Sequence, residues 1–314
     1  MGHTLPLDTP VVFLIFNRPD TTARVFAEIA RARPRRLFVV ADGPRPHVPS
    51  DAERCAAARA VVEQVDWECQ ASTHYAETNL GCGRRVSSGI AWAFAQVEEA
   101  IILEDDCLPH PDFFPFCQQL LARYRDDERV MMVAGSNMLV RHDVGESYLF
   151  SRYYNIWGWA TWRRAWQHYD YAMAGWERLR NTRAVEYCYP VRYVAQYVRK
   201  NFDLLRRGEI DTWDIQWFYA CMAQNSLAVL PRENLISNIG SAGTHTDRIH
   251  DPSLPLGELD TTALVHPREV LANAAYDERF FRQFIRESLP NRAQRYRIAA
   301  NHRYWRLRKR LGGR

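Results

Sequence analysis

The sequence predicts an α/β protein with a mostly parallel sheet flanked by helices, then an irregular half, then a basic C-terminal helix. Three observations support this fold class. Apolar strand-like runs alternate with amphipathic helical segments over residues 8–140, and seven of the ten tryptophans lie between Trp157 and Trp217. Nine Arg and one Lys against one Glu give residues 286–314 a charge of +9, which leaves −5 on the rest of a chain whose total is +4. The globular part is therefore mildly acidic and its tail strongly basic.

The first strand is expected at 11–16, where six apolar residues run without interruption and end at Asn17-Arg18-Pro19. Asp20-Thr21-Thr22 then offers an N-cap for an amphipathic helix that reaches residue 32. A second strand at 37–41 ends at the turn signal Asp42-Gly43-Pro44. These signals predict the first strand–helix–strand unit.

The same alternation continues beyond this unit. A helix is expected from Ser50 or Asp51 to about 65, a short strand at 72–75, and a helix through 97 after the turn at 79–83. The apolar run at 100–103 predicts a buried strand and ends abruptly in Glu104-Asp105-Asp106. A helix at 111–124 and a strand at 130–134 follow. This succession predicts helices on both faces of a parallel sheet.

Beyond Arg141 the alternation fades, and no internal repeat or linker interrupts the chain before about Pro252. Two interpretations of the concentrated tryptophans are open. Large flat rings with a polar edge are suited to a sugar-binding cleft, and they are equally suited to an aromatic core.

Polar residues follow three of the predicted strands. Arg18, Asp42 and the triplet Glu104-Asp105-Asp106 all lie where such strands end, and ligands of open α/β sheets bind outside those carboxyl ends. Carboxylates there predict a divalent cation that is completed by substrate phosphates, with Arg18 and Asp42 contacting the base, ribose or phosphate of a nucleoside diphosphate. The alternative is that the acidic residues only begin the next turn or cap the next helix.

Several function classes lack their motifs. No G-x-G-x-x-G follows the first strand, and neither G-x-x-x-x-G-K-[ST] nor G-x-S-x-G occurs, which argues against dehydrogenases, P-loop NTPases and α/β-hydrolases. The seven cysteines are never spaced C-x-x-C, and no apolar run approaches a membrane span or a secretory signal. We therefore expect reduced thiols and a cytoplasmic protein.

A series of short motifs resembles the GT-A glycosyltransferases, whose fold is Rossmann-like, and is most similar to the branch typified by N-acetylglucosaminyltransferase I. The match covers about residues 8–250 in the right order and with similar spacing. The motifs are 11–18, 39–42, Leu103-Glu104-Asp105-Asp106, Pro111-Asp112-Phe113-Phe114, Gly135-Ser136-Asn137, Ile156-Trp157-Gly158-Trp159-Ala160, Thr212-Trp213-Asp214-Ile215-Gln216-Trp217 and Gly240-Ser241-Ala242-Gly243-Thr244-His245. The resemblance implies a nucleotide-sugar half at 8–140, an acceptor half at 141–250 and a C-terminal extension at 251–314.

The resemblance also implies a role for each matching residue. Asp106 would bind Mn²⁺ or Mg²⁺, Asp105 would accept hydrogen bonds from the ribose, and Glu104 would shape the site. Arg18 and Asp42 would hold the nucleotide, a uridine in the simplest case. Trp159, within its own matching motif, would contact the nucleotide sugar.

Asp214 is the candidate general base of an inverting sugar transfer, which needs a carboxylate near the acceptor hydroxyl. Asp211 is the second choice for this role. The alternative is a helix cap, because Asp211 followed by an acidic third helical position is a capping arrangement.

Three further residues carry two interpretations each. His245 lies in a small, flexible sequence that is suited to closing over a nucleotide sugar, and it would contact the diphosphate or be an ordinary surface histidine. Arg84 and Arg85 lie at the start of a predicted helix. Either they face phosphate, with Arg85 as the nucleotide-sugar contact, or they lie on the solvent-exposed side of the helix.

The tail departs from the family pattern. From Asn291 onward, an apolar stripe at helical spacing is surrounded by arginines and consists of Tyr296, Ala300, Tyr304, Leu307 and Leu311. Such a helix is suited to the inner face of an anionic membrane, as a peripheral contact, or to docking on its own domain. One short basic helix is weak support for RNA binding, so no nucleic-acid partner is expected.

Together these features predict a metal-dependent glycosyltransferase that moves a sugar from a UDP-sugar, or another nucleoside-diphosphate sugar, to a hydroxyl of a glycan or glycolipid acceptor. The alternatives are a retaining GT-A transferase, in which Asp214 would not be a base, and a catalytically silent nucleotide-sugar-binding scaffold. A sugar-nucleotide pyrophosphorylase shares the general fold, but the glycine-rich loop that it needs after the first strand is absent.

Overall fold

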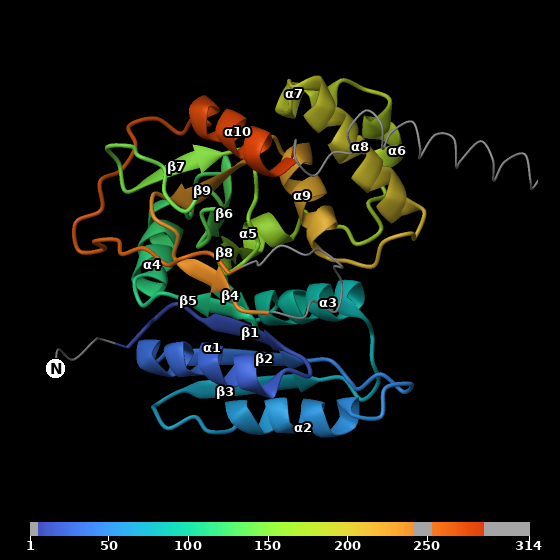
Figure 1. The fold of residues 1–314 in the computed structure, drawn as a ribbon, viewed down its shortest axis with the longest axis vertical. Coiled ribbons are helices and arrows are strands. Elements are labelled where there is room, and N and C mark those ends of the chain that lie inside the picture. Colours follow the sequence, from blue (N-terminus) through green and yellow to red (C-terminus); the bar gives the residue numbers. More distant parts are fainter. Residues whose placement is uncertain (1–5, 241–252, 286–314) are drawn as a thin grey trace, which may run out of the picture.

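An eight-stranded mixed sheet is the frame of the computed structural model, which describes residues 6–240 and 253–285 (Figure 1). In chain order, the strands are β1 (Val11–Ile15), β2 (Arg36–Ala41), β3 (Gln70–Tyr75), β4 (Glu99–Glu104), β5 (Cys107–Pro109), β6 (Val130–Ala134), β7 (Tyr148–Ser151), β8 (Trp159–Trp162), β9 (Leu227–Pro231) and β10 (Ile236–Asn238). The sheet order is β3-β2-β1-β4-β8-β6-β9-β7, and β10 pairs with β5 in a separate two-stranded sheet.

Helices cover both faces of the sheet. They are α1 (Pro19–Ala32), α2 (Asp51–Val62), α3 (Cys82–Phe94), α4 (Phe113–Arg123), α5 (Arg163–Trp166), α6 (Trp176–Arg180), α7 (Ala184–Cys188), α8 (Arg192–Arg206), α9 (Asp214–Ala223) and α10 (Ala274–Phe280), which continues as a π-helical turn (Phe281–Ile285). The predicted α/β class, with a mostly parallel sheet between helices, is confirmed (Figure 1).

Strand β1 shows why the central strands are apolar throughout. Phe13 points to the face that α1 and α4 cover, and its neighbours Val12 and Leu14 point to the face that α3 and α9 cover. All five residues of β1 are buried. A strand buried on both faces cannot alternate apolar and polar residues, so it appears in the sequence as a continuous apolar run.

The expected helix starts and ends need small corrections. Helix α1 begins at Pro19 after Arg18, and not after a cap at Asp20-Thr21-Thr22, because the fixed φ of proline and its missing N–H suit the first helical position. Helix α2 ends at Val62 and α3 at Phe94, three residues before their expected ends. Strand β8 was not expected; it runs antiparallel to both β4 and β6 and lies between them.

The tryptophan-rich half builds a core. Trp159, Trp162, Trp176, Trp213 and Trp217 are each less than 2% exposed. Trp159 stacks on Trp213 with ring centroids 5.6 Å apart and lies 5.4 Å from Trp217. For these residues the interpretation as an aromatic core is confirmed.

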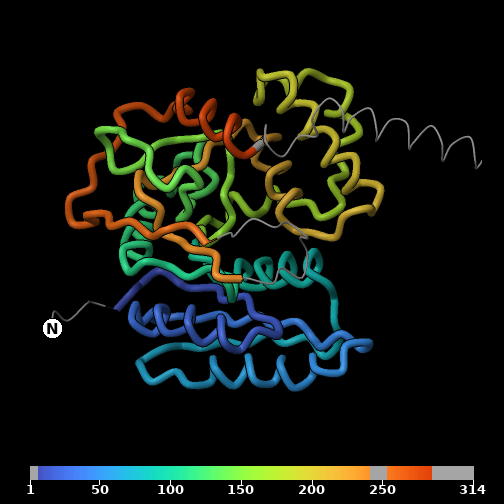
Figure 2. The backbone as a smooth tube through the Cα atoms, in the orientation of Figure 1, coloured from blue at the N-terminus to red at the C-terminus, as the bar shows by residue number. Residues whose placement is uncertain are grey.

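Residues 253–285, the described part of the predicted C-terminal extension, pack against the main sheet. Residues 253–285 run back over the upper part of the molecule, seen as the orange and red chain in Figure 2. The amide of Asn273 donates to Phe150 O of β7 (2.7 Å), and Tyr276 is fully buried with its hydroxyl 3.2 Å from Asn137 Oδ1. The described part of the predicted extension therefore completes the main domain. The basic stripe from Asn291 onward lies outside the described residues.

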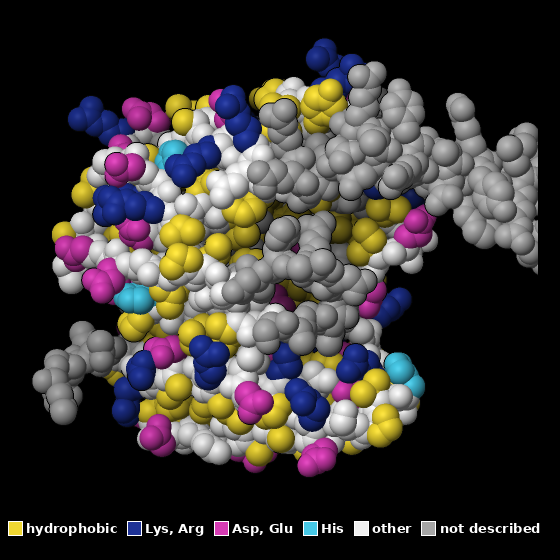
Figure 3. All heavy atoms as spheres, in the orientation of Figure 1, with side chains coloured by type: hydrophobic (Ala, Val, Ile, Leu, Met, Phe, Trp, Pro, Cys, Tyr) yellow, Lys and Arg dark blue, Asp and Glu magenta, His cyan; other side chains and the backbone are white. Residues whose placement is uncertain are grey.

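On the face shown in Figure 3, basic, acidic and hydrophobic side chains are interspersed over the half that holds α1 and α2. None of the helices in the described ranges is long and apolar enough to span a bilayer.

Candidate functional site

The register of the parallel strands brings three chain segments to one edge of the sheet. Ile15 of β1 pairs with Ala41 of β2, and Leu14 pairs with Glu104 of β4. The residues that follow these strands therefore emerge side by side. Arg18 and the triplet meet there directly, as predicted, whereas Asp42 is drawn into a neighbouring loop.

Arg18 connects the two aspartates of the triplet. Its Nη2 lies 2.6 Å from Asp105 Oδ1, and its Nη1 lies 2.6 Å from Asp106 Oδ2. Burial alone would lower the pKa of the Arg18 guanidinium, but the fields of Asp105 and Asp106 outweigh it and the net shift is upward. One guanidinium therefore holds two adjacent carboxylates at the sheet edge.

The two aspartates differ in exposure and partners. Asp105 is 2% exposed, and its Oδ2 accepts a hydrogen bond from the Phe16 amide (3.0 Å), so both of its oxygens are engaged by the end of β1. Burial raises the pKa of Asp105 to about 6 against the opposing effect of Arg18. Asp106 is more accessible, and among the described residues the one partner of its Oδ1 is the Cys107 thiol at 3.6 Å. The ribose contact predicted for Asp105 would require these bonds to rearrange.

Glu104 extends the acidic cluster toward α9. Its pKa is raised well above the ordinary value by burial first, then by Asp106 and Asp105, with a smaller contribution from Asp214. Among the described residues, its carboxylate has no hydrogen-bond or ion-pair partner. The charges of Asp105, Asp106 and Asp214 therefore all act on the Glu104 carboxylate.

The donor set suits a metal ion that phosphates complete. Within the described ranges, no group of three or more His, Cys, Asp or Glu side chains is arranged to hold a metal. An ion that relies on one carboxylate and on substrate oxygens needs no such group. Asp106 Oδ1 is a hard oxygen to which no N–H or O–H group of the described residues donates. His245, the other predicted contact of the diphosphate, lies outside the described residues.

The chain after β10 runs back to Asp106 and Arg18. The Ile239 amide donates to the Asp106 carbonyl (2.7 Å), and Gly240 follows. A Cβ on Gly240 would lie 2.6 Å from Asp106 Oδ2 and 3.0 Å from Arg18 Nη1, which is closer than a side chain allows. Glycine at this position lets the backbone approach the aspartates and Arg18.

Asp214 is the first residue of α9. Trp213 stands at the N-cap without a side-chain capping bond, so the predicted cap with Asp214 at the third helical position is wrong. The Thr212 hydroxyl instead donates to Asp214 Oδ1. Burial raises the pKa of Asp214 against this hydrogen bond and those from the backbone. A partly exposed carboxylate whose pKa is raised has the properties of a general base.

Asp211, the second choice for the base, is exposed and lies at the N-terminus of α3. A Cβ on Gly81 would lie 2.7 Å from Asp211 Oδ2, and one on Gly83 would lie 2.5 Å from Oδ1. The carboxylate therefore packs against this turn of glycines.

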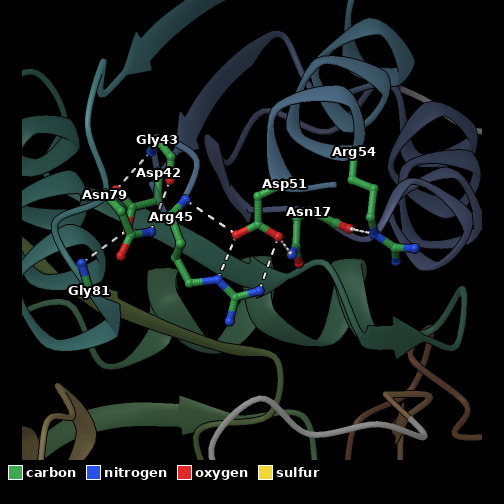
Figure 4. A network of polar contacts seen from close by, with 8 residues as sticks. All are labelled: Asn17, Asp42, Gly43, Arg45, Asp51, Arg54, Asn79 and Gly81. Carbon is green, nitrogen blue, oxygen red and sulfur yellow. Dashed lines mark hydrogen bonds and ion pairs between the residues drawn. The ribbon is translucent and has the colours of Figure 1, made fainter. Parts of the chain in front are cut away.

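Asp42 organises a loop rather than projecting from the sheet edge. Its oxygens accept hydrogen bonds from the Gly43 and Leu80 amides (2.8 and 2.9 Å) and from Asn79 Nδ2 and the Gly81 amide (3.0 and 3.1 Å). Figure 4 shows Asn79 and Gly81 directed toward this carboxylate. Burial raises its pKa against these bonds. A direct contact between Asp42 and a nucleotide would have to displace one of these donors.

Two other predicted nucleotide-sugar contacts lie in the interior. Arg85 is 4% exposed and donates to the His74 carbonyl at the end of β3, and burial lowers the pKa of its guanidinium. Trp159 is fully buried in the aromatic core. As folded, neither side chain reaches a solvent-accessible ligand, because the sheet and helices enclose both.

A buried network beside the site was missed in the sequence. Asp51, 1% exposed at the start of α2, accepts bonds from Asn17 Nδ2 (2.7 Å), from Arg45 Nε (2.5 Å) and from Arg45 Nη2 (3.0 Å), as Figure 4 shows. The Arg45 guanidinium also lies 5.5 Å from the centroid of the Phe16 ring. The network ties the loop after β1 to the loop after β2. The only sequence signal was Asp51 as a helix start, which gave no sign of its partners.

Comparisons with known proteins give the chain no family. No protein-family profile matches it, and no curated protein matches it. Among solved structures it is similar to a crystal structure of UDP-glucose pyrophosphorylase complexed with UDP-glucose, with 10% identity and a TM-score of 0.39 over 74% of this chain and 94% of that chain. A likeness at this level identifies neither family nor function. The resemblance to the N-acetylglucosaminyltransferase I branch stays a prediction from the motifs.

Proposed function

We propose that this chain transfers a sugar from a nucleoside-diphosphate sugar, with UDP as the expected nucleotide, to an acceptor hydroxyl, with inversion at the anomeric carbon. The observation that carries the proposal is the meeting of Arg18, Asp105 and Asp106 at the carboxyl edge of β1 and β4, with Asp214 near Glu104. A diphosphate and its cation fit this edge, and a base near it fits the attack of a hydroxyl.

Each group then has one task. Arg18 would bind diphosphate oxygens, and Asp106 would hold Mn²⁺ or Mg²⁺. Such an ion would neutralise the charge that develops on the departing nucleoside diphosphate. Asp214 would accept the proton of the acceptor hydroxyl as its oxygen attacks the anomeric carbon, and burial, which raises its pKa, favours that proton transfer.

One experiment separates the two carboxylates. UDP titrated calorimetrically into the protein with Mn²⁺ should bind, and Asp106→Asn should weaken binding about tenfold or more. Asp214→Asn should leave this binding intact and lower transfer from UDP-sugars to water or acceptor by roughly 100-fold, the scale of a general base. Asp20→Asn, an exposed carboxylate on α1, is the control.

Three results would count against the proposal. These are the absence of Mn²⁺-dependent UDP binding in the native chain, full binding by Asp106→Asn, and full transfer by Asp214→Asn. In that last case the anomeric configuration of the product identifies a retaining reaction. A silent scaffold would show binding without transfer to any acceptor.

A further inference from the structure

A groove of about 540 Å³ lies beside the proposed site and has no part in the roles assigned above. One wall is the outer stripe of α3, formed by Arg84, Ser87, Ser88 and Ala91 at helical spacing. The other wall is the segment 166–171 that follows α5, and α3 and α5 pack side by side (Figure 1). The volume is within the range of small-molecule sites, roughly 300–1,000 Å³.

The second wall contains aromatic rings, of which Tyr171 is exposed, Tyr169 is partly exposed and Trp166 is only 6% exposed. Trp166 and Tyr169 stack with centroids 4.3 Å apart and ring planes 12° from parallel. Tyr171 is 37% exposed, and the Arg84 guanidinium lies 5.5 Å from its ring centroid. Aromatic rings with a polar edge are suited to the C–H face of a sugar ring.

The first wall supplies neutral polar groups. The exposed Ser88 hydroxyl donates to the Arg85 carbonyl (3.1 Å), so its oxygen keeps its capacity to accept. The Ser87 hydroxyl, on a residue that is 8% exposed, donates to the Gly83 carbonyl (2.7 Å). Arg84 is the one charged side chain among the described residues that line the groove. A neutral polyhydroxylated ligand matches this lining better than a polyanion or a lipid chain.

The groove is tied to the loop that carries Asp214. The Tyr169 hydroxyl donates to the carbonyl of Trp213 (3.0 Å), the residue before Asp214. The Tyr171 hydroxyl and Asp211 Oδ1 both crowd Gly83 at the start of α3, each within 2.9 Å of where a Cβ would stand. A ligand in the groove would therefore end beside the segment that holds the candidate base.

We infer that this groove binds the saccharide part of the acceptor, with the reacting sugar directed toward Asp214. That the bound saccharide is the acceptor rests on the proposed function, but saccharide binding itself needs neither nucleotide nor metal. The acceptor would be an oligosaccharide with little or no charge.

Saturation-transfer NMR with cellopentaose, chitopentaose, maltopentaose and laminaripentaose, without UDP or metal, tests the site. At least one pentaose should receive saturation from the native chain. Ala91→Trp, at an exposed position, fills the groove and should reduce that signal fivefold or more. Ala95→Trp is the matched control, because Ala95, the C-cap residue of α3 four positions further on, is also exposed and lies outside the groove lining. Tyr171→Ala removes an aromatic face and is an independent second variant.

The inference is overturned if no pentaose binds the native chain, or if Ala91→Trp and Tyr171→Ala bind it as Ala95→Trp does. UDP calorimetry is run on the same samples. Saccharide binding without UDP binding would contradict the proposed function and leave the groove as a saccharide site. UDP binding without saccharide binding would contradict the saccharide-binding role of the groove and leave the proposed function standing.

Discussion

Asp42 and Asp51 both follow β2 and are both buried, yet their surroundings shift their pKa values in opposite directions. Asp42 accepts bonds only from backbone and amide N–H groups, and burial raises its pKa in spite of them. Asp51 is bonded by the Arg45 guanidinium, which together with Asn17 lowers its pKa to about 2. A full positive charge at hydrogen-bond distance decides the difference.

The lowered pKa of Asp51 predicts a pH-dependent contribution to stability. A fall from 3.8 to about 2 is worth about 2 kcal/mol when the carboxylate is ionised in both states. Because the folded pKa is the lower one, this stability is present above about pH 4 and is lost as the pH falls toward 2. The free energy of urea unfolding of Asp51→Asn should therefore be about 2 kcal/mol lower than that of the native chain at pH 7. This difference should shrink between pH 4 and 3.

The exposed Asp8, paired with the exposed Arg35, is the control for that series. Asp8→Asn should change the unfolding free energy by less than about 1 kcal/mol at any of these pH values. A deficit of Asp51→Asn that stays constant down to pH 3 would show that lost packing, and not ionisation, accounts for it.

At the scale of the element, α3 is positioned by glycines. Gly81 and Gly83 let Asp211 and Thr212 approach its N-terminus, and Gly89 lets its middle approach β2. A Cβ on Gly89 would lie 2.3 Å from Val40 Cγ1, and Val40 is a buried, β-branched residue of a central strand with little room to move. Because Gly89 has no side chain, α3 can pack this close to the sheet.

Gly89→Ala should destabilise the fold although alanine is the better helix former. The gain in helix propensity is about 1 kcal/mol, and overpacking against Val40 costs about 1–3 kcal/mol. Val40→Ala makes room for the added methyl group. The double variant should therefore lose less unfolding free energy than the sum of the two single losses, by at least about 0.5 kcal/mol in urea unfolding. Ser88→Ala, exposed on the same helix, should be near neutral. Simple additivity would contradict the close contact.

At the scale of the whole molecule, residues 253–285 contact both halves of the fold. Phe150 forms an isolated parallel bridge with Ala272, and the Leu259 amide donates to Asp112 Oδ2 (3.0 Å) at the start of α4. Tyr276 then fills the core between the sheet and α10. These contacts make residues 253–285 part of one cooperative unit.

Tyr276→Ala should therefore lower the free energy of global unfolding, by about 3 kcal/mol or more, the scale of a large buried aromatic side chain. Tryptophan fluorescence in urea follows the core around Trp159 and should show one transition at lower urea. Tyr187→Ala, where the side chain is 70% exposed, is the control and should stay within about 0.5 kcal/mol. A separate early transition that leaves the fluorescence unchanged would mean that the C-terminal segment unfolds on its own.

The sequence allowed the first half of the fold to be predicted for a physical reason. Strands such as β1 and β4 are buried on both faces, so each is a continuous apolar run that ends where a polar residue follows. The meeting of Arg18 with Asp105 and Asp106 could be predicted as well, because parallel strands end at the same edge of a sheet.

The rest depended on partners that are distant in the sequence. Asp42 is enclosed by a loop 37–39 residues away, which no local pattern reveals. Strand β8 consists of four buried residues, two of them tryptophans, and its sequence resembles any apolar segment until β4 and β6 are known to flank it. Trp159 matched a motif by position, but its exposure is set by the packing of Trp213 and Trp217 around it.

Strand β8 has a further consequence, for the order of events in folding. Among the strands of the eight-stranded sheet, β6 is the next along the chain after β4, but the place between them in the sheet belongs to β8, from the second half of the chain. During synthesis, the acidic triplet at the end of β4 thus borders an unfilled position in the sheet until residue 162 is available. Pairing at such long range is intrinsically slow, so the sheet edge beside the proposed site is completed late.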